Sequence, residues 1–118
     1  MEFRINAENP KKKFFPSPGT LSLLRLPTGP GVRVDTGFES GREIPPYYDS
    51  LLAKVMVWAP DRSQALARAR RALAELTVQG VASTVELHRR IVGWDKFRDG
   101  VFHTESLEEL LAGDWEYA

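Results

Sequence analysis

Proline divides this chain into two halves that must fold differently. All eight prolines lie between residues 10 and 60, and none follows Pro60. Because proline lacks a backbone N–H and clashes inside a helix, the first half favours short strands and turns. After Asp61 the apolar residues recur at helical spacings of three and four. The order of the halves predicts an α+β fold, in which a small, mostly antiparallel sheet is followed by packed helices.

Four segments of the first half have the pattern of strands. They are residues 2–7, 20–26, 32–36 and 50–58. In the third segment, the alternation of apolar and polar residues places Arg33 and Asp35 together on one face. The fourth is almost wholly apolar, with Lys54 as its single charge, and such a run predicts a strand covered on both faces.

The second half predicts three helices and one short helical turn. Asp61 with Gln64, and Ser83 with Glu86, have the spacing of capping boxes that begin helices. We expect the first helix to end at Gly80 and the second at about residue 92. We also expect a short turn at 95–99 and a last helix that is capped by Thr104 or Ser106 and runs through residue 111. Together these elements predict a single domain over residues 1–113, followed by a tail at 114–118.

Charge and composition narrow the classes of function. The chain has 16 basic and 16 acidic side chains, hence no net charge, and it has no cysteine. A concentrated basic excess, which nucleic-acid binding favours, is absent. No apolar run is long enough to span a bilayer, and the first residues do not form a signal peptide. We expect a soluble, cytoplasmic protein that binds neither nucleic acid nor membrane, although the arginines at 68, 70, 71, 89 and 90 keep nucleic-acid binding as a minor alternative.

The residues alone leave several side chains with two readings. Arg33 is suited to clamp an anion, but the residues alone favour a surface ion pair with Asp35 or Glu39. Asp49 and Ser50 are suited to catalysis, but an Asp-Ser pair before a strand more often fixes a turn. The two histidines, at 88 and 103, lack a second ligand at metal spacing, so no metal site is expected.

Five motifs in order resemble the C-terminal domain of biotin carboxylase. They are RINAE at 4–8, FPSPG at 15–19, PGVRVD at 30–35, PYYDSLLAK at 46–54, and Arg62 with the helix to Leu76. The resemblance covers nearly the whole chain. It does not choose among acetyl-CoA carboxylase (an enzyme of fatty acid biosynthesis), propionyl-CoA carboxylase and pyruvate carboxylase, which all carry such a domain.

The resemblance implies a part in the ATP- and bicarbonate-dependent carboxylation of biotin. Arg33 matches the active-site arginine that stabilises the biotin enolate, a fixed cation facing an oxygen that gains charge. The family's ATP-grasp domain, which handles ATP and Mg²⁺, is not in this sequence. We therefore expect the chain to bind no cofactor and to be inactive by itself. Its expected partners are an ATP-grasp domain and a biotin carrier domain.

The resemblance also implies an interface and a supporting shell. The family dimerises through this half of the enzyme, and Trp58 and Arg62 match part of the contact surface. Asp49, Ser50 and Lys54 are expected to hold the strand beside the active-site arginine. The alternative is a stand-alone dimerisation or interaction module that kept the fold without the chemistry.

Overall fold

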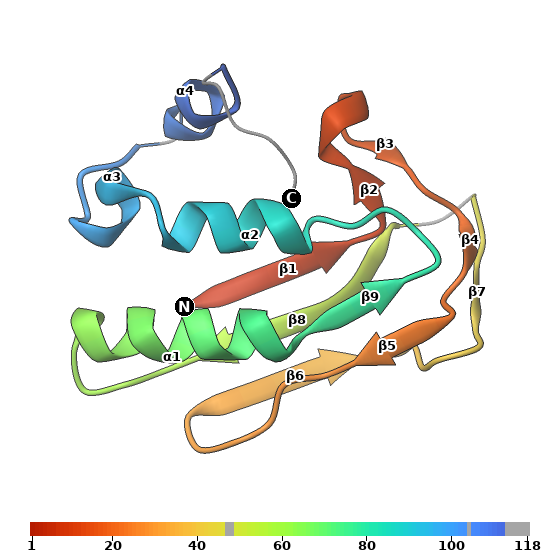
Figure 1. Ribbon diagram of the computed structural model, residues 1–118, viewed down its shortest axis with the longest axis horizontal. Helices are drawn as coiled ribbons and strands as arrows, with labels where there is room; N and C mark the ends of the chain where they lie inside the picture. The colour runs from red at the N-terminus through yellow and green to blue at the C-terminus, as the bar shows by residue number, and fades with distance from the viewer. Residues whose placement is uncertain (47–48, 104, 113–118) are drawn as a thin grey trace.

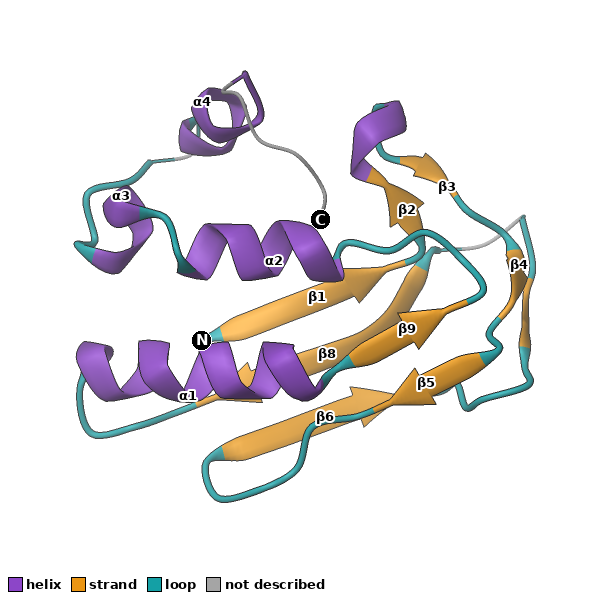
Figure 2. Cartoon of the chain, in the orientation of Figure 1, coloured by secondary structure: helices purple, strands orange, loops and turns teal. Residues whose placement is uncertain are grey.

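The computed structural model describes residues 1–46, 49–103 and 105–112. The first half forms strands β1 (Glu2–Asn6), β2 (Glu8–Asn9), β3 (Phe15–Pro16), β4 (Gly19–Thr20), β5 (Leu23–Arg25), β6 (Val32–Thr36), β7 (Glu43–Ile44) and β8 (Leu51–Val57), with the 3-10 turn η1 (Pro10–Lys12). The second half forms α1 (Arg62–Glu75), β9 (Thr77–Gln79), α2 (Val85–Val92), α3 (Asp95–Arg98) and α4 (Ser106–Ala112). Strands followed by helices confirm the predicted α+β class (Figure 2).

The main sheet has three antiparallel strands in the order β1-β8-β6. Phe3 and Val34 both lie opposite Val55 in the register, so the apolar side chains of the three strands share one face. Helices α1 and α2 lie side by side over this face (Figure 1). The two-stranded pairs β2-β3, β4-β7 and β5-β9 lie toward one end of the sheet, on the right of Figure 1.

The core forms between that face of the sheet and the two helices. Its largest fully buried side chains are Ile5, Leu21, Leu52, Val55, Val57, Leu73 and Leu76. They come from β1, β8, α1, the residue after α1 and the turn between β4 and β5, which are far apart in the sequence. Burial of each such side chain contributes about 1.5–3 kcal/mol, so the core is the main source of stability.

The expectation that β8 is covered on both faces is met only in part. Ala53, Val55 and Val57 are buried under the helices, and Leu52 is buried as well, whereas Lys54 and Met56 are half-buried. The apolar run also reflects the central position of β8, which has a neighbouring strand on each side.

Helix α1 begins as predicted but ends earlier. Asp61 is its N-cap, and the Asp61 Oδ1 accepts the backbone N–H of Gln64 at 2.8 Å. The helix ends at Glu75 rather than at Gly80, and the next residues form β9, paired with β5. Thr77 and Val78 are β-branched residues that favour a strand, and pairing with β5 satisfies backbone groups that a longer helix would have used.

Helix α2 begins one residue later than the capping box predicted. Its N-cap is Thr84, not Ser83, and Glu86 pairs with Arg89 instead of returning to the cap. The Thr84 hydroxyl donates to the Arg4 carbonyl at 3.3 Å and accepts the Asn6 N–H at 3.0 Å. The hydroxyl is therefore committed to β1, which explains why it makes no cap hydrogen bond to its own helix.

The remaining expectations are met in part. The predicted strand at 20–26 is divided into β4 and β5, which pair with different partners. The short turn at 95–99 is α3, and the last helix is α4, whose first residue Ser106 accepts the His103 N–H through its Oγ at 2.8 Å. Thr104 and the tail at 114–118 lie outside the described residues.

Candidate functional site

A polar face of the three-stranded sheet, opposite α1 and α2, forms the candidate site. The register aligns Arg4, Lys54 and Asp35 across the three strands. In the adjacent row Arg33 lies opposite Met56. Glu2 lies opposite Met56 on the other side, so this face brings three cations, Arg4, Arg33 and Lys54, together with two carboxylates, Glu2 and Asp35. Such a face is suited to meet an anion or an oxygen that gains negative charge.

Arg33 is an exposed cation of this face, and its guanidinium is oriented by an ion pair. Its guanidinium donates through Nε to Asp35 Oδ1 at 3.0 Å and through Nη2 to Asp35 Oδ2 at 3.3 Å. The side chains are 67% and 50% exposed, so the pair adds little to stability. The ion pair that the sequence left as an alternative is thus present, and it leaves the rest of the fork open to solvent.

The loop before β6 fixes the position of Arg33 and is held by α1. Gly31 has φ +71, a left-handed conformation that favours glycine, and its carbonyl accepts the Trp58 N–H at 3.1 Å. Arg68 donates to the Trp58 carbonyl, and Arg71 donates to the Thr28 carbonyl at 3.1 Å. These two arginines lie three residues apart on one helix face. That spacing was visible in the sequence, but their role in anchoring a loop was not predicted.

The three predicted supporting residues lie around the start and middle of β8. Asp49 Oδ1 accepts the Leu51 N–H at 3.1 Å, which is a turn at the strand entry. The Ser50 carbonyl accepts the Ala7 N–H at 2.8 Å, so Ser50 joins β8 to the end of β1 through its backbone. Lys54 is half-buried on the polar face between Arg4 and Asp35.

Trp58 and Arg62, the predicted contact residues, lie at the beginning and end of the β8–α1 connection. Trp58 is 59% exposed, an unusual exposure for so large an apolar side chain. The Arg62 guanidinium lies over the rings of Phe97 and Phe102, at 5.0 and 5.7 Å from their centroids. It also donates to the carbonyls of Phe97 and Arg98, so Arg62 is engaged within its own chain.

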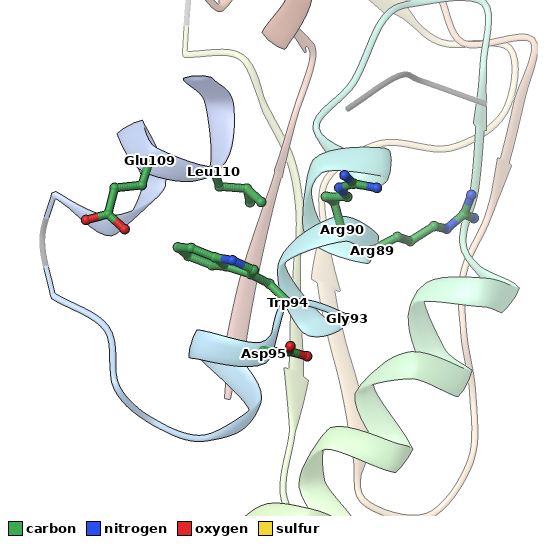
Figure 3. A pocket seen from close by; sticks show the side chains of 7 residues that line it. All are labelled: Arg89, Arg90, Gly93, Trp94, Asp95, Glu109 and Leu110. Carbon is green, nitrogen blue, oxygen red and sulfur yellow. The ribbon is translucent and has the colours of Figure 1, made fainter. Parts of the chain in front are cut away.

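An open groove of about 540 Å³ lies between α2, α3 and α4 (Figure 3). The Trp94 side chain points toward Leu110 of α4 across the groove. The charged residues on its walls include Arg89, which donates to the carbonyls of Leu73 and Leu76 at the end of α1. Glu109 is paired with Lys96, and this ammonium lowers the pKa of the Glu109 carboxyl. We place the candidate site on the sheet face because these groove charges serve the fold.

His88 connects α2 to β1 rather than to the site. Its Nε2 lies 2.8 Å from the Arg4 carbonyl, which can only accept, so Nε2 carries the proton. Burial lowers the pKa of His88, and the hydrogen bond to Arg4 opposes this shift. No group of three or more acidic or histidine side chains suited to a metal occurs among residues 1–46, 49–103 and 105–112. Within these ranges, no helix has the length and apolar character needed to cross a bilayer.

Comparison with known proteins identifies what this arrangement resembles. Residues 2–109 match the family described as Biotin carboxylase C-terminal domain. Biotin carboxylase 1 of Bacillus subtilis is 45% identical over 108 residues, which are 92% of this chain and 24% of that protein. The 2-oxoglutarate carboxylase small subunit of Hydrogenobacter thermophilus is 49% identical over 109 residues, 92% of this chain and 23% of that protein.

Solved structures show the same fold. The biotin carboxylase domain dimer of Hydrogenobacter thermophilus 2-oxoglutarate carboxylase, in complex with MgADP, ADP and bicarbonate, superposes with a TM-score of 0.91 at 46% identity. The biotin carboxylase subunit of pyruvate carboxylase gives a TM-score of 0.91 at 40% identity. Each match covers 98% of this chain and 26% of the solved chain. The chain therefore spans about a quarter of the length of these relatives.

Proposed function

Because this chain belongs to the biotin carboxylase C-terminal domain family, we propose that it supplies one wall of the site in which a biotin-dependent carboxylase carboxylates biotin. The observation that carries the proposal is the polar sheet face, on which Arg33 is held by Asp35 and still presents donors to solvent. An always-charged guanidinium fixed there stabilises the negative oxygen of deprotonated biotin. Arg33 is the catalytic residue of this proposal.

The nucleotide chemistry belongs to a part of the enzyme outside these residues. The 2-oxoglutarate carboxylase relative is described with MgADP and bicarbonate, and this chain spans 26% of that protein's chain. The ATP-grasp domain would hold ATP, Mg²⁺ and bicarbonate, and a biotin carrier domain would deliver biotin. We accordingly propose that the isolated chain neither hydrolyses ATP nor carboxylates biotin. Biotin-dependent ADP release by the purified chain would contradict this.

A chimera tests the role of the chain and of Arg33. The matching quarter of Bacillus subtilis biotin carboxylase 1 is replaced by this chain, folding is checked by thermal unfolding, and carboxylation of free biotin is measured. We expect activity, and Arg33→Ala should reduce kcat by about 10²–10³, the usual cost of removing one oxyanion donor. Arg25→Ala, an exposed arginine on β5, is the matched control.

The outcomes separate two claims. A folded but inactive chimera would show that this chain does not serve as a biotin carboxylase domain. An active chimera that tolerates Arg33→Ala would keep that assignment and remove the catalytic role of Arg33. The choice among acyl-CoA, pyruvate and 2-oxoglutarate carboxylases depends on a different component of the enzyme, which the chimera does not contain.

A second candidate function, self-association, is favoured by exposed apolar side chains. Trp58 is 59% exposed, and Val101 and Phe102 are 65% and 46% exposed, with the Phe102 ring under the Arg62 guanidinium. Exposed aromatic and arginine side chains are typical of interface hot spots. Sedimentation velocity on the chain should show a dimer that Trp58→Ala weakens, whereas Phe15→Ala, 65% exposed on β3, should not. A monomer at all concentrations would argue against it.

A further inference from the structure

The edge of the Arg33 guanidinium that can meet a ligand is limited by Asp35. We propose that Asp35 is the positioning residue for Arg33, and that it leaves the end of the fork, with Nη1 and Nη2, to bind the charged oxygen of the substrate. The inference rests on the proposed function and deepens it, since it states how the cation is aimed and from which direction the oxygen approaches.

The hydrogen bonds between the two side chains define the occupied edge. Both carboxylate oxygens of Asp35 are used, one on Nε at 3.0 Å and one on Nη2 at 3.3 Å. A guanidinium has five N–H donors in one plane, and this contact takes the two on its side edge. The two hydrogens of Nη1 and the second hydrogen of Nη2 remain, and they lie at the end of the side chain.

The strand makes this contact reproducible. Arg33 and Asp35 lie two residues apart on β6, so both side chains leave the same face of one extended backbone. Pairing with β8 fixes that backbone, with Arg33 opposite Met56 and Asp35 opposite Lys54. The strand already holds both Cα atoms in place, so the entropy cost of the pair is limited to the rotamers of the two side chains.

The Asp35 carboxylate also separates the positive charges of Arg33 and Lys54. Lys54 lies diagonally across from Arg33 on the same face, so without Asp35 the two positive charges would repel each other with no carboxylate between them. The guanidinium would then turn away from Lys54 and from the position the strand gives it. Asp35 therefore sets both the rotation of the fork and its direction.

The contribution of the pair to folding should be small, and its contribution to catalysis large. Both side chains are at least half exposed, and water screens such pairs. A domain that covers this face would exclude water and strengthen each charge interaction. Removal of Asp35 should consequently lower activity without lowering the melting temperature.

The first test uses the 118-residue chain itself. In ¹⁵N-edited NMR spectra, the Nε–Hε signal of Arg33 should have a heteronuclear NOE close to that of the β6 backbone. Asp35→Asn should lower it to the value of a mobile arginine side chain, and Glu39→Gln, which removes an equal exposed charge three residues from β6, should not. A mobile Arg33 Nε in the unsubstituted chain would overturn the inference.

The second test uses the active chimera. Asp35→Asn should reduce kcat by about tenfold to a hundredfold, the cost of misplacing a catalytic group, with a smaller change in KM for biotin. In an Arg33→Lys background, where there is no fork to orient, Asp35→Asn should add almost nothing. Full activity of Asp35→Asn together with loss of activity in Arg33→Ala would reject the positioning role alone. Full activity of both variants would reject the catalytic role of Arg33.

Discussion

Replacement of Gly80 by alanine tests the close approach between the end of β9 and the β4–β5 segment. Gly80 has φ +101, and a Cβ there would overlap the Thr20 carbonyl oxygen and lie 2.8 Å from the Ser22 nitrogen. The Ser22 N–H donates to the Gln79 carbonyl at 3.0 Å at this point of contact. Both obstacles are backbone atoms, so rotation of a side chain cannot relieve the overlap.

The expected loss has three parts. The left-handed conformation costs an alanine about 1–2 kcal/mol. Reduced freedom of the unfolded chain returns about 0.4–1 kcal/mol. If the strands must separate and the Ser22 hydrogen bond is lost, unsatisfied backbone groups cost about 1–3 kcal/mol. The net loss is about 1–5 kcal/mol, a large share of the roughly 6–18 kcal/mol expected for a chain of this length.

Two other glycines serve as matched controls. Gly41 has φ +91 but no atom within 4 Å of an added Cβ, so Gly41→Ala should cost only about 1 kcal/mol. Gly37 has neither restriction, so Gly37→Ala should be neutral or slightly stabilising. Urea unfolding followed by circular dichroism gives all three values. If Gly80→Ala and Gly41→Ala agree within about 0.5 kcal/mol, the reasoning from close approach is refuted.

Three further predictions concern stability. The folded-state pKa of His88 lies below its unfolded value, so the contribution of neutral His88 to the free energy of unfolding is complete above about pH 6.5 and is lost as the pH falls through the folded pKa. The urea midpoint should therefore drop with falling pH in the unsubstituted chain and in His103→Gln, but this drop should be absent in His88→Gln. Arg89→Met should cost about 2–4 kcal/mol in urea unfolding, since it removes charged donors from the carbonyls of Leu73 and Leu76 at the end of α1; an equal effect of Arg25→Met, an exposed arginine on β5, would count against this reason. Asp61→Ala should cost about 0.5–2 kcal/mol through loss of the α1 cap, and an unchanged midpoint would argue against that cap.

The sequence predicted correctly those elements that depend on residues close together in the chain. The alternation in β1 and β6, and the Asp61 cap, depend on residues within a few positions of one another, and all appear in the structure. Strand β9 was missed because Leu76 continues the helical spacing of α1, whereas the competing interaction is a pairing with β5 more than fifty residues earlier. Tertiary contacts of that kind leave no periodic signal in the sequence.

The same distinction applies to the site. That Arg33 and Asp35 share a face follows from the two-residue period of a strand, and the structure agrees. That Arg62 is bound to carbonyls at Phe97 and Arg98 could not be predicted, because those groups are 35 and 36 residues away. Its role in a dimer contact stays a prediction, as does the supporting role of Lys54.

The hydrogen bonds from α2 to β1 have a consequence for association between chains. Strand β1 ends the sheet on one side, and the outward N–H of Asn6 and outward carbonyls of Arg4 and Asn6 would otherwise be free to pair with a strand from another molecule. Thr84 and His88 occupy these groups instead. A chain truncated after β9 would lose both residues, and this uncovered border of the sheet would invite aggregation through strand addition.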